Sequence, residues 1–369
     1  MEYYVVLTGS KNNSGDFLIK YRALQLFNSL RPDRNIIDFD AWKVLTDEQL
    51  EIINSSKALI LCGGPSLQTN MYPKIYALVK DLDLIKVPII TLGIGYKDMY
   101  GAWEKTHKYE LSNDTIRLLD RIKSDSFVSS VRDYHTLNVL LSKGYDNYLM
   151  TGCPALYDLK FLNTPFNQLN RTDMICFSLG VSYLESEGMF KLMQDSILTS
   201  REIFLGSDFV VLFHHKINTE NSKQRHMVEW LKSINIPFRD ISGEVNMMIH
   251  EYAKADFHIG YRVHAHILMS SMSKPSVLIN EDSRGRALSN VIEGLYFDAH
   301  LSNPLNFIKR GLNKFTGSKN LFLPYSNLSQ DLRNNLKYEL QHGFPRILKS
   351  RRSIDGLFVN MKEFISKLP

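Results

Sequence analysis

The residues with the clearest chemical meaning are Arg262 and His264, in the run Gly260-Tyr261-Arg262-Val263-His264. The run follows an apolar segment typical of a buried strand and opens a segment with helical spacing. The first turn of a helix attracts anions through its free N–H groups and its dipole. An arginine there adds a planar fork for carboxylate or phosphate, and a nearby histidine can move protons near neutral pH. The plain structural alternative is a helix cap whose arginine pairs with a surface carboxylate.

Other cationic side chains also follow predicted strands. They are Arg132, His214, Arg284 and Arg286. Each has an ordinary structural reading. Arg132 is then a salt-bridged surface arginine beside Asp133, which caps the next helix, and His214 is a satisfied core histidine. Arg284 and Arg286 are then solvated loop charges. Taken with Arg262 and His264, however, they predict one cleft that binds a small, highly anionic ligand and performs acid–base chemistry.

Two glycine-bearing loops complete the candidate site. The first loop, residues 12–16, precedes a helix and is expected to hold a phosphate or a sugar. The second is a tight turn that lets the backbone approach a ligand, or is a plain strand-to-helix turn. The residues concerned are Asn13, Gly15, Asp16, Gly63 and Gly64.

Several common chemistries are excluded by the motifs. The first loop lacks the Lys-Ser/Thr ending of a Walker loop, and Gly93-x-Gly95 lacks the third glycine of a dinucleotide-binding turn. The sequence contains no His-Glu-x-x-His and no Gly-x-Ser-x-Gly. His264 and His266 are two residues apart, so on a helix they do not face one ligand. We therefore expect no metal, no nicotinamide cofactor and no P-loop use of ATP.

These residues are carried by apolar strands that alternate with amphipathic helices, which predicts doubly wound parallel sheets. A polar stretch, Asn163–Thr172, separates two such runs. We expect an N-terminal domain at 1–162, a C-terminal domain at 173–300 and a basic helical tail at 301–369. Ligands of such sheets bind at the carboxyl ends of strands. The predicted strands are Tyr3–Leu7, Asn35–Phe39, Ala58–Cys62, Val87–Leu92, Phe127–Val131, Asn147–Met150, Met174–Leu179, Asp208–Phe213, Asp256–Ile259 and Ser276–Ile279.

Composition limits the class of protein. The 369 residues carry a net charge of +5, with 12 Lys+Arg against 4 Asp+Glu in residues 301–369. No apolar run approaches the roughly 18 residues that span a bilayer, and we expect no signal peptide. Three cysteines without metal-ligand spacing are expected to be reduced thiols of a cytoplasmic protein. No basic stripe carries aromatic residues in the body of the chain, so nucleic acid is not an expected partner.

The basic tail has three readings. It is a solvated helical face, a terminal helix that packs back on the N-terminal domain, or a peripheral contact with an anionic membrane that keeps the enzyme near lipid-linked acceptors at the inner face. The last reading depends on Lys349, Arg351 and Arg352 lying near apolar residues such as Ile347 and Leu357.

Taken in order, the motifs resemble the polysaccharide pyruvyl transferases over about residues 5–293. The family's Asn-x-Gly-Asp loop corresponds to residues 13–16, and its Gly-Gly-Gly strand end corresponds to residues 63–65, with Pro65 as a departure. The Ser-x-Arg-Asp element corresponds to residues 130–133 and Pro-Ala-Leu to 154–156. Gly-x-Arg-Leu-His corresponds to residues 260–264, with Val263 in place of leucine.

The resemblance implies two Rossmann-like domains that face across a cleft, similar to the GT-B fold. It implies transfer of pyruvate from phosphoenolpyruvate to two hydroxyls of a sugar in a surface glycan, giving a cyclic ketal and phosphate. Arg262, Val263, His264 and Arg132 are then expected at the donor, together with Arg284 and Arg286. The acceptor is expected at the loops of residues 13–16 and 63–64. Pro65 puts the shape of that turn in doubt.

We expect His264 to protonate the donor methylene as a general acid. His214 or Asp16 is expected to take the hydroxyl proton. Two alternatives remain at this point. One is a GT-B glycosyltransferase with a nucleotide-sugar donor, whose ribose Glu281 or Asp282 would bind. The other is a non-catalytic glycan-assembly protein on the same fold.

Overall fold

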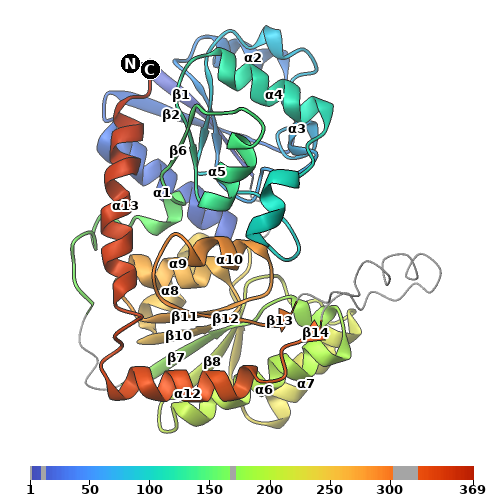
Figure 1. Cartoon of the computed structure of the whole chain (residues 1–369), viewed down its shortest axis with the longest axis vertical. Coiled ribbons are helices and arrows are strands. Elements are labelled where there is room, and N and C mark those ends of the chain that lie inside the picture. The colour runs from blue at the N-terminus through green and yellow to red at the C-terminus, as the bar shows by residue number, and fades with distance from the viewer. Residues whose placement is uncertain (1, 10–13, 167–171, 302–322) are drawn as a thin grey trace, which may run out of the picture. The chain divides into compact units, whose positions relative to one another are not determined.

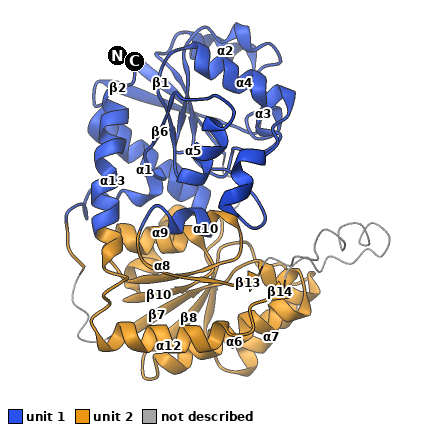
Figure 2. Ribbon diagram, viewed as in Figure 1, with its two compact units in different colours: residues 1–163, 286–292, 352–369 blue, residues 164–285, 293–351 orange. Residues whose placement is uncertain are grey.

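A computed structural model describes residues 2–9, 14–166, 172–301 and 323–369, which form two units (Figure 2). Unit 1 consists of Met1–Asn163, Arg286–Ile292 and Arg352–Pro369, and unit 2 consists of Thr164–Gly285 and Glu293–Arg351. The expected end of the first domain at residue 162 is next to the observed end of its first segment. The basic segment 301–369, expected as one tail, is divided between the two units.

Unit 1 is built on parallel strands. Four pair in the order β2-β1-β3-β4, and β5 pairs with β6. A parallel bridge between Ile94 and Val131 joins the end of β4 to β5, and the Thr91 N–H donates to the Ser129 hydroxyl across the same seam at 3.1 Å. The strands are β1 (Glu2–Thr8), β2 (Arg34–Asp40), β3 (Leu59–Cys62), β4 (Ile89–Leu92), β5 (Ser129–Val131) and β6 (Tyr148–Met150).

The helices of unit 1 follow these strands in the chain. Helix α1 packs on β2 and β3, α4 on β4, and α5 on β5 and β6. Most of α13 also belongs to unit 1, where Phe358 lies against Tyr157 with ring centroids 5.3 Å apart. The helices are α1 (Ser14–Leu30), α2 (Asp47–Asn54), α3 (Met71–Lys74), α4 (Asn113–Ser124), α5 (Tyr134–Leu141) and α13 (Lys349–Ser366), with short 3-10 helices at Leu82–Leu84, Trp103–Lys108 and Pro154–Leu156.

Unit 2 holds a six-stranded sheet in the order β12-β11-β10-β7-β8-β9, with every pair parallel. Counted from β7, this is the Rossmann order of strands, in which the first and fourth strands are neighbours. The strands are β7 (Met174–Ser178), β8 (Asp208–Phe213), β9 (Phe238–Asp240), β10 (Phe257–Gly260), β11 (Ser276–Asn280) and β12 (Leu295–Asp298), with a separate antiparallel pair β13 (His300–Leu301) and β14 (Leu323–Pro324).

Helices cover both faces of the unit 2 sheet (Figure 1). Residues of α6, α7 and α12 form one hydrophobic core with Phe177 and Ile259 of the strands. Successive strand residues point to opposite faces, so Ser178 and His258 face the side of α8 and α9. The helices are α6 (Glu187–Ile203), α7 (Ser222–Ser233), α8 (Val245–Lys254), α9 (Val263–Ser271) and α12 (Leu328–Gln341), and the 3-10 helix η4 spans Ser182–Leu184. Helix α10 (Ser283–Ser289) is divided between the units, because its residues from Arg286 on belong to unit 1.

The predicted fold class, α/β with doubly wound parallel sheets, is confirmed. All ten predicted strands are present, each with its ends within two residues of the prediction. β9 and β12 were not predicted, because these edge strands of the unit 2 sheet are short and mix apolar with charged residues. The two-residue strands β13 and β14 were not predicted either. Within the described residues, no helix is both long enough and apolar enough to cross a membrane.

Candidate active site

The turn from β10 into α9 places Arg262 at the start of the helix. Arg262 is the N-cap residue of α9, with φ −90° and ψ 113°, and its side chain does not cap the helix. The turn requires glycine at position 260, where φ is +152° and a Cβ atom would lie 2.4 Å from the Ser178 carbonyl oxygen. The first N–H groups of α9 therefore follow directly on a buried arginine, an arrangement suited to an anion.

The end of β7 holds Arg262 in place. The Ser178 hydroxyl accepts the Arg262 backbone N–H at 3.0 Å, and the Leu179 carbonyl accepts Nε at 2.8 Å. The neighbouring Tyr261 N–H donates to the Ser178 carbonyl at 2.9 Å. The residue is only 8% exposed, and within the described residues no carboxylate lies within salt-bridge distance of its guanidinium. The two Nη nitrogens are thus available for a ligand.

Four neighbouring strands bring the other predicted cations of unit 2 to the same edge of the sheet. The order β11-β10-β7-β8 places the residues after each strand side by side at the carboxyl ends. In a Rossmann sheet, ligands bind at the point where the strand order reverses, which here lies between β7 and β10. Arg262 and Ser178 flank that point. Sheet topology and residue chemistry therefore indicate the same location.

Electrostatics at this edge favour an anion. Burial lowers the pKa of Arg262, Glu281 opposes that shift and Arg284 adds to it. His215, directly after β8, has a pKa lowered to about 4 by burial and then by Arg262 and Arg284. A bound anion would reverse the effect of these positive charges and raise the pKa of His215.

His214, one of the two side chains predicted to accept the hydroxyl proton, is buried in unit 2. It is 1% exposed, its Nε2 lies 2.7 Å from the Tyr252 hydroxyl, and burial holds its pKa well below the usual range. It therefore matches the core-histidine reading. The accessible histidine is its neighbour His215, which the sequence analysis missed. Burial is continuous from Phe209 to His214, so no alternation along the sequence could have distinguished the two histidines.

The remaining donor candidates fall in different places. His264 is the second residue of α9 and is 5% exposed, and Val263 is the partly exposed first residue. Arg284 forms a bidentate pair with Asp282 through Nε at 2.9 Å and Nη2 at 2.6 Å. Arg286 belongs to unit 1, where it donates to the Tyr100 carbonyl. Arg284 and Arg286 therefore belong to different units, and their predicted grouping at one donor stays a prediction.

The two carboxylates considered for a nucleotide ribose already have structural partners. Glu281 Oε2 accepts the N–H groups of Val181 and Ser182 at 2.8 and 2.9 Å, which fixes the loop after β7. Asp282 holds Arg284. The pair with Arg284 disfavours Asp282 as the ribose ligand, whereas Glu281 Oε1 is buried without a hydrogen-bond partner among the described residues, so its ribose assignment stays a prediction. Among the described residues, no three His, Cys, Asp or Glu side chains gather in a way that could hold a metal ion.

Unit 1 carries a second cluster at its own strand ends. Arg132 follows β5 and is 7% exposed, with Nε 3.4 Å from Asp133. It packs so closely on Gly95 that a Cβ atom there would lie 2.0 Å from Arg132 Nε. Asp133 caps α5 by accepting the Thr136 N–H at 2.7 Å, as predicted. Arg132 and Arg262 belong to different units, and their convergence on one ligand stays a prediction.

The predicted acceptor loops lie in unit 1. Gly15 is buried and Asp16 is partly exposed in the first turn of α1, whereas Asn13 lies outside the described residues. Gly63 and Gly64 both have positive φ, +63° and +71°. A Cβ atom at Gly63 would lie 2.3 Å from Ile19, but the space beside Gly64 is open. The turn thus leaves backbone accessible at Gly64.

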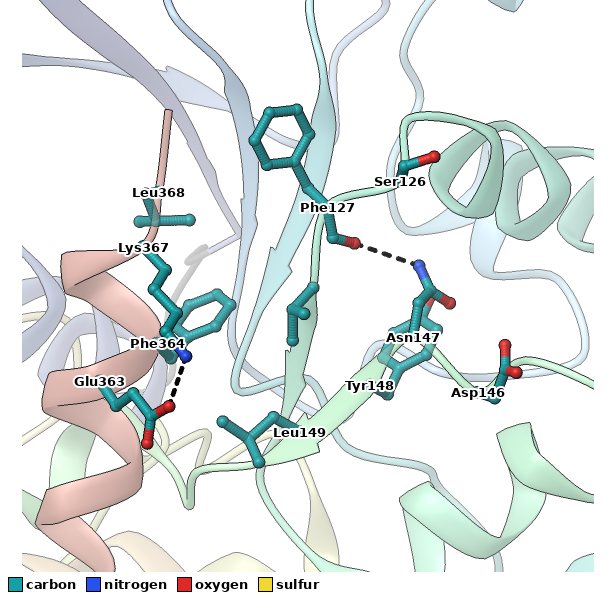
Figure 3. Close-up of a pocket in the computed structure, with 11 residues that line it drawn as sticks. Ser126, Phe127, Asp146, Asn147, Tyr148, Leu149, Glu363, Phe364, Lys367 and Leu368 are labelled. Carbon is teal, nitrogen blue, oxygen red and sulfur yellow. Dashed lines mark hydrogen bonds and ion pairs between the residues drawn. The ribbon is translucent and has the colours of Figure 1, made fainter.

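A separate pocket of about 460 Å³ lies elsewhere in unit 1 (Figure 3). Phe127 and Asn147, which precede β5 and β6, line it together with Leu149 and with Phe364 and Lys367 of α13. The pocket is therefore at the amino ends of these strands, and Arg132 is at the carboxyl end of β5. We assign none of the candidate site to it.

The C-terminal segment buries the apolar residues on which the membrane reading depends. Ile347 is 1% exposed and Leu357 is 9% exposed. Arg351 is buried and donates to the carbonyls of Ser270 and Ser271 at 3.4 and 3.2 Å. These side chains stabilise the fold, and the contact with a membrane stays a prediction.

Comparison with solved structures defines the class of protein. Staphylococcus aureus MnaA in complex with UDP is 10% identical, with a TM-score of 0.51 over 100% of this chain and 98% of that chain. A putative UDP-N-acetylglucosamine 2-epimerase from Listeria monocytogenes is 14% identical, with a TM-score of 0.49 over 94% and 97% of the two chains. The first likeness shows the fold: this chain is a GT-B-like α/β protein with two Rossmann-like units.

A family model then identifies the group within that class. The model for polysaccharide pyruvyl transferase matches residues 13–283, which include the clusters around Arg132 and Arg262. The chain belongs to the polysaccharide pyruvyl transferase family, as the motif resemblance predicted. A search of curated proteins returned no match.

Proposed function

We propose that this protein transfers pyruvate from phosphoenolpyruvate to two hydroxyls of a sugar, forming a cyclic ketal and releasing phosphate. Family membership supports a transferase of this general kind. The observation that carries the donor assignment is Arg262: a buried guanidinium at the start of α9, held through Nε, with no carboxylate partner within the described residues.

Phosphoenolpyruvate matches this edge of unit 2 because it carries a carboxylate and a phosphate. The Arg262 fork can bind either group in a bidentate manner. The N–H groups at the start of α9 and the Arg284 guanidinium supply further positive charge. A substrate with one negative charge would leave this cationic edge poorly neutralised. No metal or cofactor is part of the proposal.

In the proposed reaction, His264 donates a proton to the methylene carbon of phosphoenolpyruvate, which leaves an oxocarbenium-like centre at C2. One sugar hydroxyl attacks C2 and loses its proton to a base. The C2–O bond to phosphate then breaks, and the second hydroxyl closes the ring. One hydroxyl proton replaces the proton that the methyl group gained, and the other leaves with phosphate. Acid–base catalysis of this kind contributes about 10²–10⁴-fold.

We propose His215, in place of His214, as one candidate for the base, with Asp16 as the other. His215 is neutral at pH 7 because its pKa is about 4, so it can accept a proton. The acceptor is proposed to approach the loops of Asp16 and Gly64, which carry a carboxylate and open backbone. A lipid-linked sugar is compatible with this proposal, and peripheral contact with an anionic membrane then depends on surface charge.

The test is phosphate release from phosphoenolpyruvate, with and without a panel of lipid-linked, nucleotide-linked and polymeric sugars, in buffer that contains a metal chelator. We expect release only with an acceptor, together with a product whose mass rises by that of a pyruvate ketal. The matched control is His264→Ala, which should lose turnover by about 10²–10⁴-fold and keep the fold. Binding of a nucleotide-sugar without any binding of phosphoenolpyruvate would contradict the proposal and favour a glycosyltransferase.

A further inference from the structure

A chain of hydrogen-bonded side chains lies beneath Arg262, within unit 2. It begins at the Ser178 hydroxyl, which accepts the Arg262 N–H and lies 2.8 Å from His258 Nε2. Three contacts continue it: His258 Nδ1 to Ser276 Oγ at 2.7 Å, His266 Nδ1 to the same oxygen at 2.7 Å, and His266 Nε2 to the Tyr296 hydroxyl at 3.2 Å. The proposed chemistry uses none of these residues.

Both histidines of this chain are neutral. His258 and His266 are 0% and 1% exposed, and burial lowers the pKa of each. A neutral imidazole donates through one nitrogen and accepts through the other, and here both nitrogens of both rings are engaged. Neither ring can turn without breaking a buried hydrogen bond, so the Ser178 hydroxyl is held in a fixed position.

The end of β7 is itself held from the other side. Glu281 accepts the N–H groups of Val181 and Ser182, two and three residues beyond Leu179. Register adds to this, because Gly260 pairs directly with Ser178 across the two strands. Ser178 therefore lies between a rigid buried chain and a rigid loop, and its hydroxyl and carbonyl both bind the turn that carries Arg262.

A polar chain is not the simplest way to fill a core. Apolar side chains of the same shape can stabilise a fold as well as a buried hydrogen-bonded pair does. The polar chain ends, however, on the backbone N–H of Arg262, whose two Nη nitrogens make no ion pair or hydrogen bond within the described residues. A displacement of that backbone would move both the guanidinium and the first N–H groups of α9.

We propose that Ser178 and His258 are positioning residues for the donor: they fix the backbone of Arg262 so that its fork and the start of α9 meet one anion. This inference rests on the proposed function for the identity of that anion. Neither residue is proposed to touch the substrate.

The test compares Ser178→Ala with Ser196→Ala in the full chain. Ser196 is a matched control, because it is also fully buried and its hydroxyl lies 2.9 Å from the side-chain hydroxyl of Tyr261, the neighbour of Arg262. Both variants lose one buried hydroxyl, so we expect similar drops in melting temperature. Only Ser178→Ala should raise the Kd for phosphoenolpyruvate, by about tenfold for one lost hydrogen bond, and Ser178→Cys should show an intermediate rise.

Hydrogen exchange at the Arg262 amide separates this inference from the proposed function. We expect that amide to exchange faster in Ser178→Ala and to keep the wild-type rate in Ser196→Ala. If wild-type protein binds no phosphoenolpyruvate, the proposed function fails, and the exchange rates alone decide the positioning role. Equal changes in the two serine variants, in affinity or in exchange, would overturn it, as would an unchanged Ser178→Ala.

Discussion

At the scale of single residues, the decisive feature is how much of each charged side chain is already committed to the protein. Arg284 is bound by Asp282, and Glu281 by the loop after β7, but Arg262 uses only Nε. Residue type alone does not distinguish these cases. Of the candidate cations of unit 2, Arg262 therefore offers both of its Nη nitrogens to a ligand, whereas Arg284 would be shared between a ligand and Asp282.

Arg262→Ala should weaken binding of phosphoenolpyruvate by about 2–5 kcal/mol, the range for removing one partner of a buried charge pair. Arg262→Lys should restore little of this, because an ammonium group cannot make the bidentate contact. Isothermal titration calorimetry measures both. Arg225→Ala, which removes an exposed arginine of α7, is the control and should bind the donor normally. Donor binding that survives in Arg262→Ala would remove this residue from the site.

His214 and His215 should give opposite results on substitution. His214→Ala removes the buried hydrogen bond between His214 and the Tyr252 hydroxyl, so it should lower the free energy of unfolding by about 1–3 kcal/mol. His215→Ala should leave stability close to wild type and reduce turnover. Urea unfolding measures the stability of both variants, and phosphate release measures their turnover. Each variant serves as the control for the other. A stable, inactive His214→Ala protein would reverse our assignment.

At the scale of elements, one buried carboxylate holds the turn between two helices. The turn between α12 and α13 depends on Glu339, which is fully buried. Its carboxylate accepts Arg346 Nε at 2.6 Å and the backbone N–H groups of Arg346 and Ile347, both at 3.3 Å. The sequence shows only a charged residue on a polar helix, because a single buried position does not alter the helical pattern.

Glu339→Gln should therefore lower the free energy of unfolding by about 1.5–3 kcal/mol, the range for hydrogen bonds to a charged group. The control is Glu363→Gln on α13, whose pair with Lys367 is exposed and is worth about 0.3–0.5 kcal/mol. Denaturant unfolding of the full chain measures both. Similar losses for the two variants would show that the turn does not depend on the buried carboxylate.

At the scale of the whole molecule, buried neutral histidines make stability depend on pH. Burial lowers the pKa of His214 and His258 well below the usual 6.5, and lowers that of His266 to about 3. The unfolded chain binds these protons near pH 6.5 and the folded chain does not. The stability contributed by these residues is thus fully present above pH 6.5 and is lost as the pH falls.

We expect the free energy of unfolding to fall between about pH 6 and 4 by about 1.4 kcal/mol per pH unit for each such histidine. His266→Gln should reduce the slope of the free energy of unfolding against pH by about 1.4 kcal/mol per pH unit. His342→Gln, at an exposed position of the turn after α12, should not change it. Urea titrations at several pH values give the slopes, and a His266→Gln slope equal to wild type would contradict this account.

The sequence by itself determined the ten predicted strands, the alternation of strands with helices and the family, because apolar runs and glycine turns are local features. It also selected Arg262 and His264 by their place between a strand and a helix. It could not separate His214 from His215, since the two are adjacent and only the packing of His214 against Tyr252 of α8 buries one of them. Only the tertiary structure decided that β10 lies beside β7, which brings Ser178 under Arg262 across 84 residues of sequence. The reason is physical: strand order results from long-range pairing and packing, which no local pattern encodes.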